Sequence, residues 1–211
     1  MKKLVAALDV LSSEKAVKIA KDIVDYVDEF KVNYPLVLSA GIKVIKDLSK
    51  IRPVIADFKI ADVPHLAYMI SKIAFESGAL AVIVHGFSGS DSVKATLDVA
   101  RDFDGKVYVV TELSSKGGEE YMTKFSVDIA KMAKKLGCHG IIAPATRVEK
   151  VKILREVVGK MEILCPGVGF QGGSFEVLKF ADGIIVGRSI YESEDPKKSA
   201  REIREIINKR T

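Results

Sequence analysis

An aspartate and a lysine two residues apart end one of the apolar runs of this sequence. In Asp57-Phe58-Lys59, the alternation of a β-strand places both charged side chains on one side, the side that Ile55 shares. An inward lysine beside an aspartate is unfavourable unless the charges pair, and such pairs commonly mark sites of chemistry. A fixed ammonium can stabilise a developing negative charge and supply a proton. The alternative is a buried ion pair that only ties the layers of the fold together.

Two further charged residues end other apolar runs. Asp9 follows Ala7-Leu8, and Lys31 lies in Phe30-Lys31-Val32. Either residue alone is unremarkable, because strand ends reach solvent. If the strands are parallel, both converge on the same mouth as the aspartate–lysine pair, which favours a single charged site.

Asp62 follows three residues after Lys59 and has two interpretations. It either belongs to the charged site or caps the next helix, because Val63-Pro64 comes directly after it. Aspartate is a preferred N-cap residue and proline is common in the first turn of a helix.

A glycine-rich segment, 166–173, offers a second kind of chemistry. Its G-x-G-x-x-G spacing is a weak dinucleotide signal, because it does not follow the first strand and no acidic residue ends the next strand. We expect a mobile loop whose N–H groups reach a phosphate, with Gln171, the only glutamine, making a specific hydrogen bond. Gly187 and Arg188 would add an N–H and a guanidinium fork suited to a phosphate dianion. The alternative is a glycine-rich turn and a surface arginine.

The sequence carries no metal-ligand spacing of His, Cys, Asp or Glu. Glu112 is the one carboxylate that could support a metal together with Asp57, and we expect neither a metal nor a cofactor. His85 ends an apolar run, so it could belong to the site or to the scaffold. Two cysteines are too few for a disulfide scaffold or a cysteine-rich zinc site.

The elements that must position these residues repeat one rhythm: a short β-branched run, a loop, and a longer stretch of helical periodicity. The strand-like runs are 4–8, 29–32, 54–59, 80–85, 107–112, 140–143, 162–165 and 183–186. Runs such as 81–84 are apolar throughout, which is typical of a parallel sheet buried on both faces. Eight units of about 26 residues favour a single-domain (β/α)8 TIM barrel over 1–211, with its chemistry at the carboxyl ends of the strands. An open doubly wound sheet is the alternative, and it needs only six units.

Three helical stretches show apolar residues at three-four spacing, which predicts that each buries this stripe. The stripes are Ala16, Ile19, Ala20, Ile23, Val24 and Val27; Leu66, Met69, Ile70, Ile73 and Ala74; and Ala200, Ile203, Ile206 and Ile207.

Composition argues against several classes of function. The chain has 33 Lys and Arg against 28 Asp and Glu, a net charge of +5, and these charges are interleaved rather than clustered with aromatics, unlike a nucleic-acid-binding face. No apolar run reaches the roughly 18 residues of a membrane span. The apolar run near the amino terminus is too short for a signal peptide. We therefore expect a cytoplasmic protein with neither a nucleic-acid nor a membrane partner.

Several segments resemble the orotidine 5′-phosphate decarboxylase family, in its short archaeal form, and they follow one another in the family's order. The resemblance implies a cofactor-free, homodimeric (β/α)8 barrel. It also implies a carboxy-lyase that converts orotidine 5′-phosphate to uridine 5′-phosphate and CO2, the last step of de novo pyrimidine (UMP) biosynthesis. The segments are Asp57-x-Lys59-x-x-Asp62, Tyr34-Pro35-Leu36-Val37-Leu38-Ser39, Val84-His85-Gly86-Phe87, Thr111-Glu112-Leu113-Ser114, Pro166-Gly167-Val168-Gly169-x-Gln171-Gly172-Gly173 and Ile185-Val186-Gly187-Arg188-Ser189-Ile190-Tyr191.

The resemblance implies a role for each charged residue. Lys31, Asp57, Lys59 and Asp62 would form a catalytic tetrad in which Asp62 comes from the partner subunit. Asp9 and Lys31 would also hold the ribose of the substrate.

The resemblance further implies the residues that bind the rest of the nucleotide. Ser114 would bind the pyrimidine edge, and Pro166 would help to enclose the base. Gln171, Gly187 and Arg188 would bind the phosphate. The sequence departs from the family at Leu66, because relatives often have a threonine there that hydrogen-bonds the ribose across the dimer, which leucine cannot do.

Two rival functions fit part of the pattern. A Mg-dependent sugar-phosphate decarboxylase or synthase of the same superfamily would share the D-x-K-x-x-D motif and would need a metal site through Glu112 and Asp57. A non-catalytic phosphate-ligand-binding barrel would explain the glycine-rich loop. It gives no reason to keep Lys59 facing inward among carboxylates.

Overall fold

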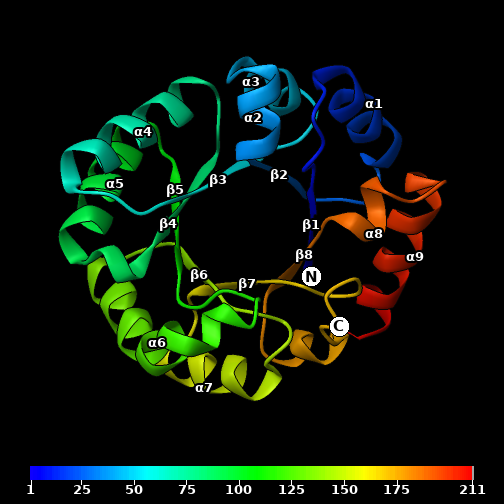
Figure 1. Ribbon diagram of the computed structural model, residues 1–211. Coiled ribbons are helices and arrows are strands. Elements are labelled where there is room, and N and C mark those ends of the chain that lie inside the picture. Colours follow the sequence, from blue (N-terminus) through cyan, green and yellow to red (C-terminus); the bar gives the residue numbers. More distant parts are fainter. Residues whose placement is uncertain (211) are drawn as a thin grey trace.

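Within residues 1–210, which the computed structural model describes, eight parallel strands pair in chain order and close into a barrel (Figure 1). β1 pairs with both β2 and β8, which closes the sheet. The single (β/α)8 barrel predicted from the sequence rhythm is therefore confirmed. The strands are β1 (Lys3–Ala7), β2 (Glu29–Asn33), β3 (Val54–Ile60), β4 (Ala81–His85), β5 (Lys106–Val110), β6 (Gly140–Ile142), β7 (Glu162–Pro166) and β8 (Gly183–Val186).

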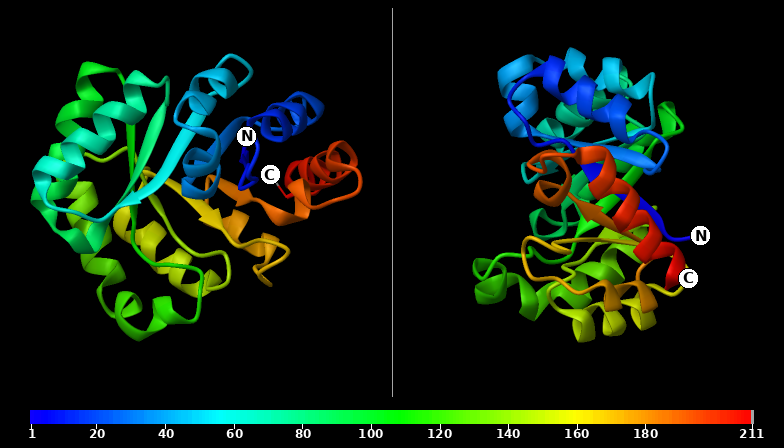
Figure 2. Two further views of the ribbon diagram at one scale, coloured as in Figure 1. Left: turned by 45° about the horizontal axis from the view of Figure 1, so that its top comes forward. Right: turned by 90° about the vertical axis from the view of Figure 1, so that its right-hand side faces the viewer.

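Helices surround the barrel on its outside, and the two chain ends lie on the same side of it (Figure 2). The seventh strand is followed only by a short 3-10 helix, where the sequence rhythm predicted a longer helical stretch. The helices are α1 (Ser13–Ile23), α2 (Tyr34–Ala40), α3 (Lys43–Ser49), α4 (Pro64–Glu76), η1 (Gly86–Ser88), α5 (Ser90–Asp102), α6 (Gly117–Leu136), α7 (Val148–Val158), η2 (Phe175–Lys179), α8 (Arg188–Tyr191) and α9 (Pro196–Lys209). None of the helices in this part of the chain is both long enough and apolar enough to span a membrane.

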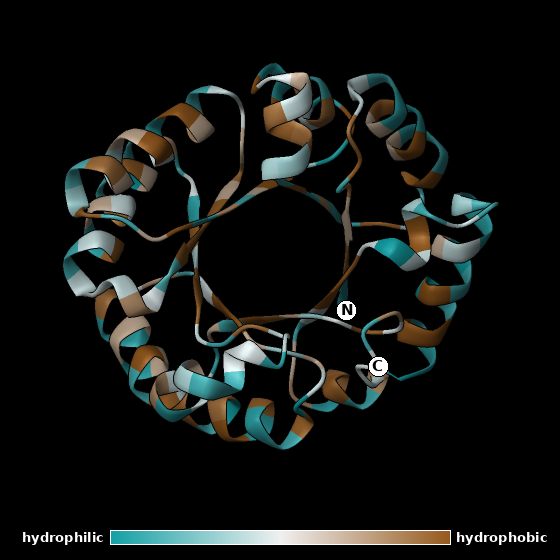
Figure 3. Cartoon of the chain, viewed as in Figure 1, coloured by the Kyte–Doolittle hydropathy of each residue, from teal (hydrophilic) through white to brown (hydrophobic). Residues whose placement is uncertain are grey.

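Alternation along the strands produces two hydrophobic layers. One set of side chains fills the barrel interior, and the other packs between the sheet and the helices. Figure 3 shows hydrophobic residues along the strands and, alternating with hydrophilic ones, on the helices around them. The interior set includes Val5, Ile55, Ile83, Val110 and Leu164.

The apolar stripes of the first and last helices are largely buried, as predicted. α1 buries Ala16, Ile19, Ala20 and Ile23, although the helix ends before Val24 and Val27. α9 buries Ala200 and Ile207, and Ile203 packs partly against the core.

The stripe predicted for α4 is wrong in most of its residues. Leu66, Met69 and Ile73 are 40, 45 and 49% exposed. The helix instead buries a face of mostly smaller residues. On this face, Ser71 Oγ donates to Thr96 Oγ1 of α5 at 3.3 Å. Small side chains let the two helices approach closely, so the larger apolar residues of α4 remain outside.

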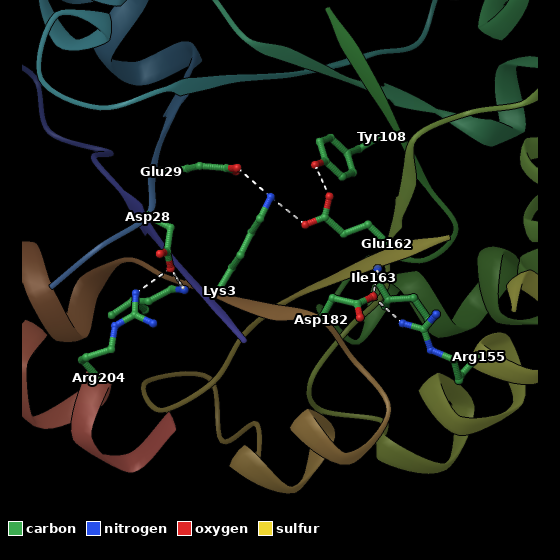
Figure 4. A network of polar contacts seen from close by, with 10 residues as sticks. Lys3, Asp28, Glu29, Tyr108, Arg155, Glu162, Ile163, Asp182 and Arg204 are labelled. Atoms are coloured by element: carbon green, nitrogen blue, oxygen red, sulfur yellow. Dashed lines mark hydrogen bonds and ion pairs between the residues drawn. The ribbon is translucent and has the colours of Figure 1, made fainter. Parts of the chain in front are cut away.

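A network of charged and polar side chains fills the amino-terminal end of the barrel (Figure 4). Lys3 Nζ lies 2.7 Å from Glu29 Oε1 and 2.8 Å from Glu162 Oε1. The Tyr108 hydroxyl donates to the other oxygen of Glu162 at 2.6 Å, and burial together with Glu162 raises the pKa of Tyr108. This arrangement closes the floor of the barrel.

Candidate active site

A pocket opens at the carboxyl ends of the strands, where barrels of this kind hold their chemistry. Every site residue predicted from the sequence lines it except Asp62. Those lining residues are Asp9, Lys31, Asp57, Lys59, Ser114, Pro166, Gln171, Gly187 and Arg188.

Four of these residues form a chain of alternating charges. Lys59 Nζ lies 2.8 Å from both carboxylate oxygens of Asp57, and Lys31 Nζ lies 2.8 Å from Asp57 Oδ2. Lys31 Nζ also lies 3.4 Å from Asp9 Oδ1. Asp57 is 3% exposed, so its charge is balanced by the two ammonium groups rather than by water.

The charges of Lys31 and Asp57 stabilise each other. Burial alone would lower the pKa of Lys31, but the charges of Asp57 and Asp9 outweigh it and raise that pKa above 10.5. Burial alone would raise the pKa of Asp57, but Lys31 and Lys59 outweigh it and hold that pKa below 3.8. Both groups are therefore ionised at neutral pH.

The backbone of β3 is irregular where it carries this cluster. Ala56 pairs with Val82 and Ile60 pairs with Val84, so the register shifts between them. Lys59 has φ 41°, in the left-handed region that residues other than glycine rarely occupy. Asp57 and Lys59 do meet on the inner side, as alternation predicted. The local backbone strain that accompanies this contact is typical of functional sites.

Asp62 lies outside the cluster. α4 begins at Pro64 with Val63 at the N-cap position, and no side chain caps it, so the N-cap interpretation of Asp62 is wrong. The carboxylate accepts a hydrogen bond from the neighbouring Val63 N–H at 2.8 Å and stays exposed. Its backbone carbonyl accepts from the hydroxyl of Ser92, which fixes the loop.

The glycine-rich segment folds over the pocket. Gly173 N–H donates to the carbonyl of Gly167 at 2.9 Å, and Gly172 N–H donates to that of Gly169 at 2.7 Å. Gly167 has φ 99°, and a Cβ there would lie 3.1 Å from Gln171 Oε1 and 3.5 Å from Ser114 Cβ. The loop, Gln171 and Ser114 are therefore neighbours.

Three polar side chains line the pocket beside this glycine-rich segment. The side chains of Ser114, Gln171 and Arg188 form neither hydrogen bonds nor ion pairs with residues 1–210. The guanidinium of Arg188 lies over the ring of Phe170, with its central carbon 3.8 Å from the ring centroid. The donors of these side chains are free for a ligand.

One side of the pocket is apolar, and this apolar wall was not predicted from the sequence. Ile83, Val110 and Ile142 line the pocket from β4, β5 and β6. Their only signal was an inward position near a strand end. Asn33, also missed, lines the pocket and caps α2 by accepting from Tyr34 N–H at 2.6 Å.

His85 and Glu112 are both buried. His85 is 7% exposed, its Nδ1 has no hydrogen-bond partner within residues 1–210, and burial together with Lys59 lowers its pKa to about 4. Glu112 does not pair with Asp57; it accepts from the hydroxyl of Thr123 and lies 3.1 Å from Arg147 Nη1. Across the described residues, no three His, Cys, Asp or Glu side chains are grouped so as to hold a metal.

The sequence and the fold both match known proteins. The sequence profile of the Orotidine 5'-phosphate decarboxylase / HUMPS family matches residues 2–203. The orotidine 5′-phosphate decarboxylase of Methanococcoides burtonii is 47% identical over 209 residues, which cover 98% of this chain and 97% of the relative. The decarboxylase of Methanocaldococcus jannaschii is 46% identical over an alignment of 215 residues, which covers 99% of this chain and 100% of the relative.

Solved structures agree over the same length. The crystal structure of the Methanocaldococcus jannaschii decarboxylase complexed with the inhibitor BMP superposes with a TM-score of 0.95 at 45% identity, covering 99% of both chains. The decarboxylase of Pyrococcus horikoshii OT3 superposes with a TM-score of 0.89 at 38% identity, covering 97% of this chain and 99% of the other.

Proposed function

Because the chain belongs to the orotidine 5′-phosphate decarboxylase / HUMPS family, we propose that it converts orotidine 5′-phosphate to uridine 5′-phosphate and CO2 in pyrimidine biosynthesis. The observation that carries this proposal is the chain of alternating charges that ends at Lys59. It lies in the same pocket as the unpartnered groups of Ser114, Gln171 and Arg188. One end of the pocket suits the reacting ring and the other suits a phosphate.

The chemistry requires a fixed cation. Loss of CO2 from C6 of the pyrimidine leaves a carbanion in an orbital that the ring does not delocalise well. An ammonium beside C6 stabilises that charge as it develops and then protonates it. Lys59 is the residue for both roles, because Asp57 holds its Nζ through two contacts of 2.8 Å.

Asp57 contributes in a second way. Lys31 and Lys59 keep it ionised, so it repels the substrate carboxylate and this repulsion is relieved as CO2 departs. The apolar wall of Ile83, Val110 and Ile142 favours neutral CO2 over the charged carboxylate. Both effects lower the energy of the transition state relative to the bound substrate.

The remaining residues bind the nucleotide. Asp9 and Lys31 hold the ribose, Ser114 bonds the pyrimidine edge and Pro166 encloses the base. Gln171, Gly187 and Arg188 bind the phosphate dianion, Arg188 through its guanidinium fork. The phosphate is remote from C6, so its binding energy serves to close the glycine-rich loop and to exclude water.

We also propose that two copies of the chain form a homodimer in which Asp62 completes the partner's charged tetrad. Two observations support this arrangement. Asp62 is exposed and makes no ion pair with residues 1–210 of its own chain. The α4 face of Leu66, Met69 and Ile73 is apolar, exposed and follows directly after it. A second copy would cover this face and bring Asp62 to the other mouth, and a two-fold axis would complete both sites at once.

Further exposed apolar residues lie at the same end of the barrel. Phe87, Tyr121 and Phe125 are 60, 74 and 52% exposed and line an apolar groove between η1 and α6. η1 and the start of α6 follow the carboxyl ends of β4 and β5, as the start of α4 follows β3. The groove therefore offers the homodimer a second apolar surface near the mouth.

The metal-dependent rival is less well supported. It needs Glu112 beside Asp57, and Glu112 instead directs Oε1 to Arg147 and Thr123. The test is turnover of orotidine 5′-phosphate by purified protein in EDTA, with uridine 5′-phosphate detected by chromatography. We expect full conversion without added metal or cofactor. Absence of uridine 5′-phosphate, or complete dependence on Mg²⁺, would refute the proposal.

A further inference from the structure

An exposed aromatic ring lies against the arginine at the phosphate end of the pocket. Phe170 is 61% exposed, and the guanidinium carbon of Arg188 lies 3.8 Å from the centroid of its ring. A cation over the face of an aromatic ring is attracted by the negative charge of that face. The contact joins the tip of the glycine-rich loop to the first residue of α8.

This contact leaves the hydrogen-bonding capacity of Arg188 intact. The guanidinium carries five N–H donors, and the ring presents no carboxylate or carbonyl oxygen that would occupy them. The Arg188 side chain has no hydrogen-bond or ion-pair partner among residues 1–210, so its contact with the Phe170 ring restrains a guanidinium that is otherwise unpaired. A restrained fork loses less conformational entropy when it binds an anion than a free one does.

The same contact restrains Gln171. Phe170 and Gln171 lie together in a turn that is closed by the Gly172 N–H donating to the Gly169 carbonyl at 2.7 Å. Gly169, with φ 79°, permits the tight path of the chain there. Holding the ring on Arg188 therefore also holds the neighbouring Gln171 over the pocket.

We propose that Phe170 is a positioning residue for phosphate binding: its ring orients Arg188 and keeps the loop closed without touching the phosphate. This inference rests on the proposed function, in which Arg188 and Gln171 bind the phosphate of the nucleotide. Phe170 should increase affinity for ligands that carry a phosphate and should matter little for the nucleoside.

The test measures binding of uridine 5′-phosphate and of uridine by calorimetry to wild type, Phe170→Leu and Phe170→Trp. Leucine keeps an apolar side chain but has no aromatic face, and we expect it to raise the Kd for uridine 5′-phosphate roughly two- to fivefold. Tryptophan should keep the wild-type Kd, and the Kd for uridine should not change in either variant. A wild-type Kd for uridine 5′-phosphate in Phe170→Leu, or an equal loss for both ligands, would overturn the inference.

A double-mutant cycle shows whether the ring acts through Arg188. In an Arg188→Ala background, Phe170→Leu should have no further effect on the Kd for uridine 5′-phosphate. A penalty that persists in that background would overturn the inference, because the ring would then act elsewhere. Binding does not depend on turnover, so the two proposals fail differently. Wild type that neither binds uridine 5′-phosphate nor converts the substrate contradicts both proposals, whereas failure of the cycle alone contradicts only this one.

Discussion

Lys59 Nζ lies 2.8 Å from both carboxylate oxygens of Asp57, although the backbone of Lys59 is in the left-handed region. The register shift in β3 accompanies this contact. A backbone conformation of this kind costs about 1–3 kcal/mol and persists only where its surroundings determine it. The pairing therefore gives Lys59 one fixed position at the mouth of the barrel.

Asp57→Asn should damage both activity and stability. The substitution removes the charge that balances two ammonium groups, and losing one partner of a buried ion pair costs roughly 3–5 kcal/mol. We expect at least about a hundredfold loss of kcat, because the ammonium at C6 is no longer held. Denaturant unfolding and steady-state kinetics measure the two effects. A variant with activity within tenfold of wild type would show that Asp57 is dispensable.

His85 should make the protein less stable in acid. Its pKa is lowered by burial and by Lys59 from 6.5 to about 4 in the folded chain. Between these values the unfolded chain binds a proton that the folded chain does not, so the free energy of unfolding falls as pH falls from 6.5 to 4. His85→Phe should lose less stability over this window in urea unfolding, with the same substitution at exposed His65 as the control. If the free energy of unfolding fell equally between pH 6.5 and 4 in wild type and His85→Phe, the lowered pKa of His85 would be contradicted.

Arg188→Ala should weaken phosphate-bearing ligands selectively. A charge-assisted hydrogen bond contributes about 1.5–3 kcal/mol, so we expect the Kd for uridine 5′-phosphate to rise roughly tenfold to a hundredfold. The Kd for uridine should not change, because uridine presents no dianion. Arg201→Ala, at an exposed position of α9, is the matched control. An equal loss of affinity for both ligands would show that Arg188 does not bind the phosphate.

Subunits with different lesions should complement each other. In a mixed dimer of Lys59→Ala and Asp62→Ala chains, one site carries both lesions and the other is intact. About half of the dimers would be mixed, so activity should return to about a quarter of wild type. Turnover is measured after subunit exchange, and light scattering checks that the protein is dimeric. If exchange occurs and no activity returns, Asp62 serves its own chain.

The apolar face of α4 provides the control for this experiment. Met69→Asp places a charge on the surface that we assign to the dimer, so adding it to both chains should prevent complementation. Lys152→Glu, at an exposed position of α7, also changes charge and should leave complementation intact. Complementation that survives Met69→Asp would place the dimer surface elsewhere.

The sequence predicted the barrel and the charged cluster because both follow from simple periodicities. Apolar runs at regular intervals indicate buried parallel strands, and alternation predicts that Asp57 and Lys59 lie on the same side of their strand. The left-handed backbone of Lys59 could not be predicted from the sequence, because the register shift depends on pairing with β4.

The other differences between the predictions and the structure also have physical reasons. The helical pattern of α4 showed an apolar face but not what covers it, so Leu66 and its neighbours were predicted to be buried in the chain's own core. Ile83 and Ile142 resemble any other buried strand residue, and only the closed barrel shows that they line the pocket. The partners of Glu112, one of which is Arg147, lie too far away in the sequence to be paired by spacing.

If Lys59 stabilises and protonates the carbanion left by CO2, Lys59→Ala should abolish turnover without abolishing binding. Turnover of orotidine 5′-phosphate is measured for wild type and variant together with the Kd for uridine 5′-phosphate. We expect the variant to lose at least about 10⁴-fold in kcat, since both charge stabilisation and proton donation disappear. The variant should still bind uridine 5′-phosphate, because the contacts to phosphate and base survive. Turnover within about tenfold of wild type by a variant that still binds the nucleotide would contradict this role of Lys59.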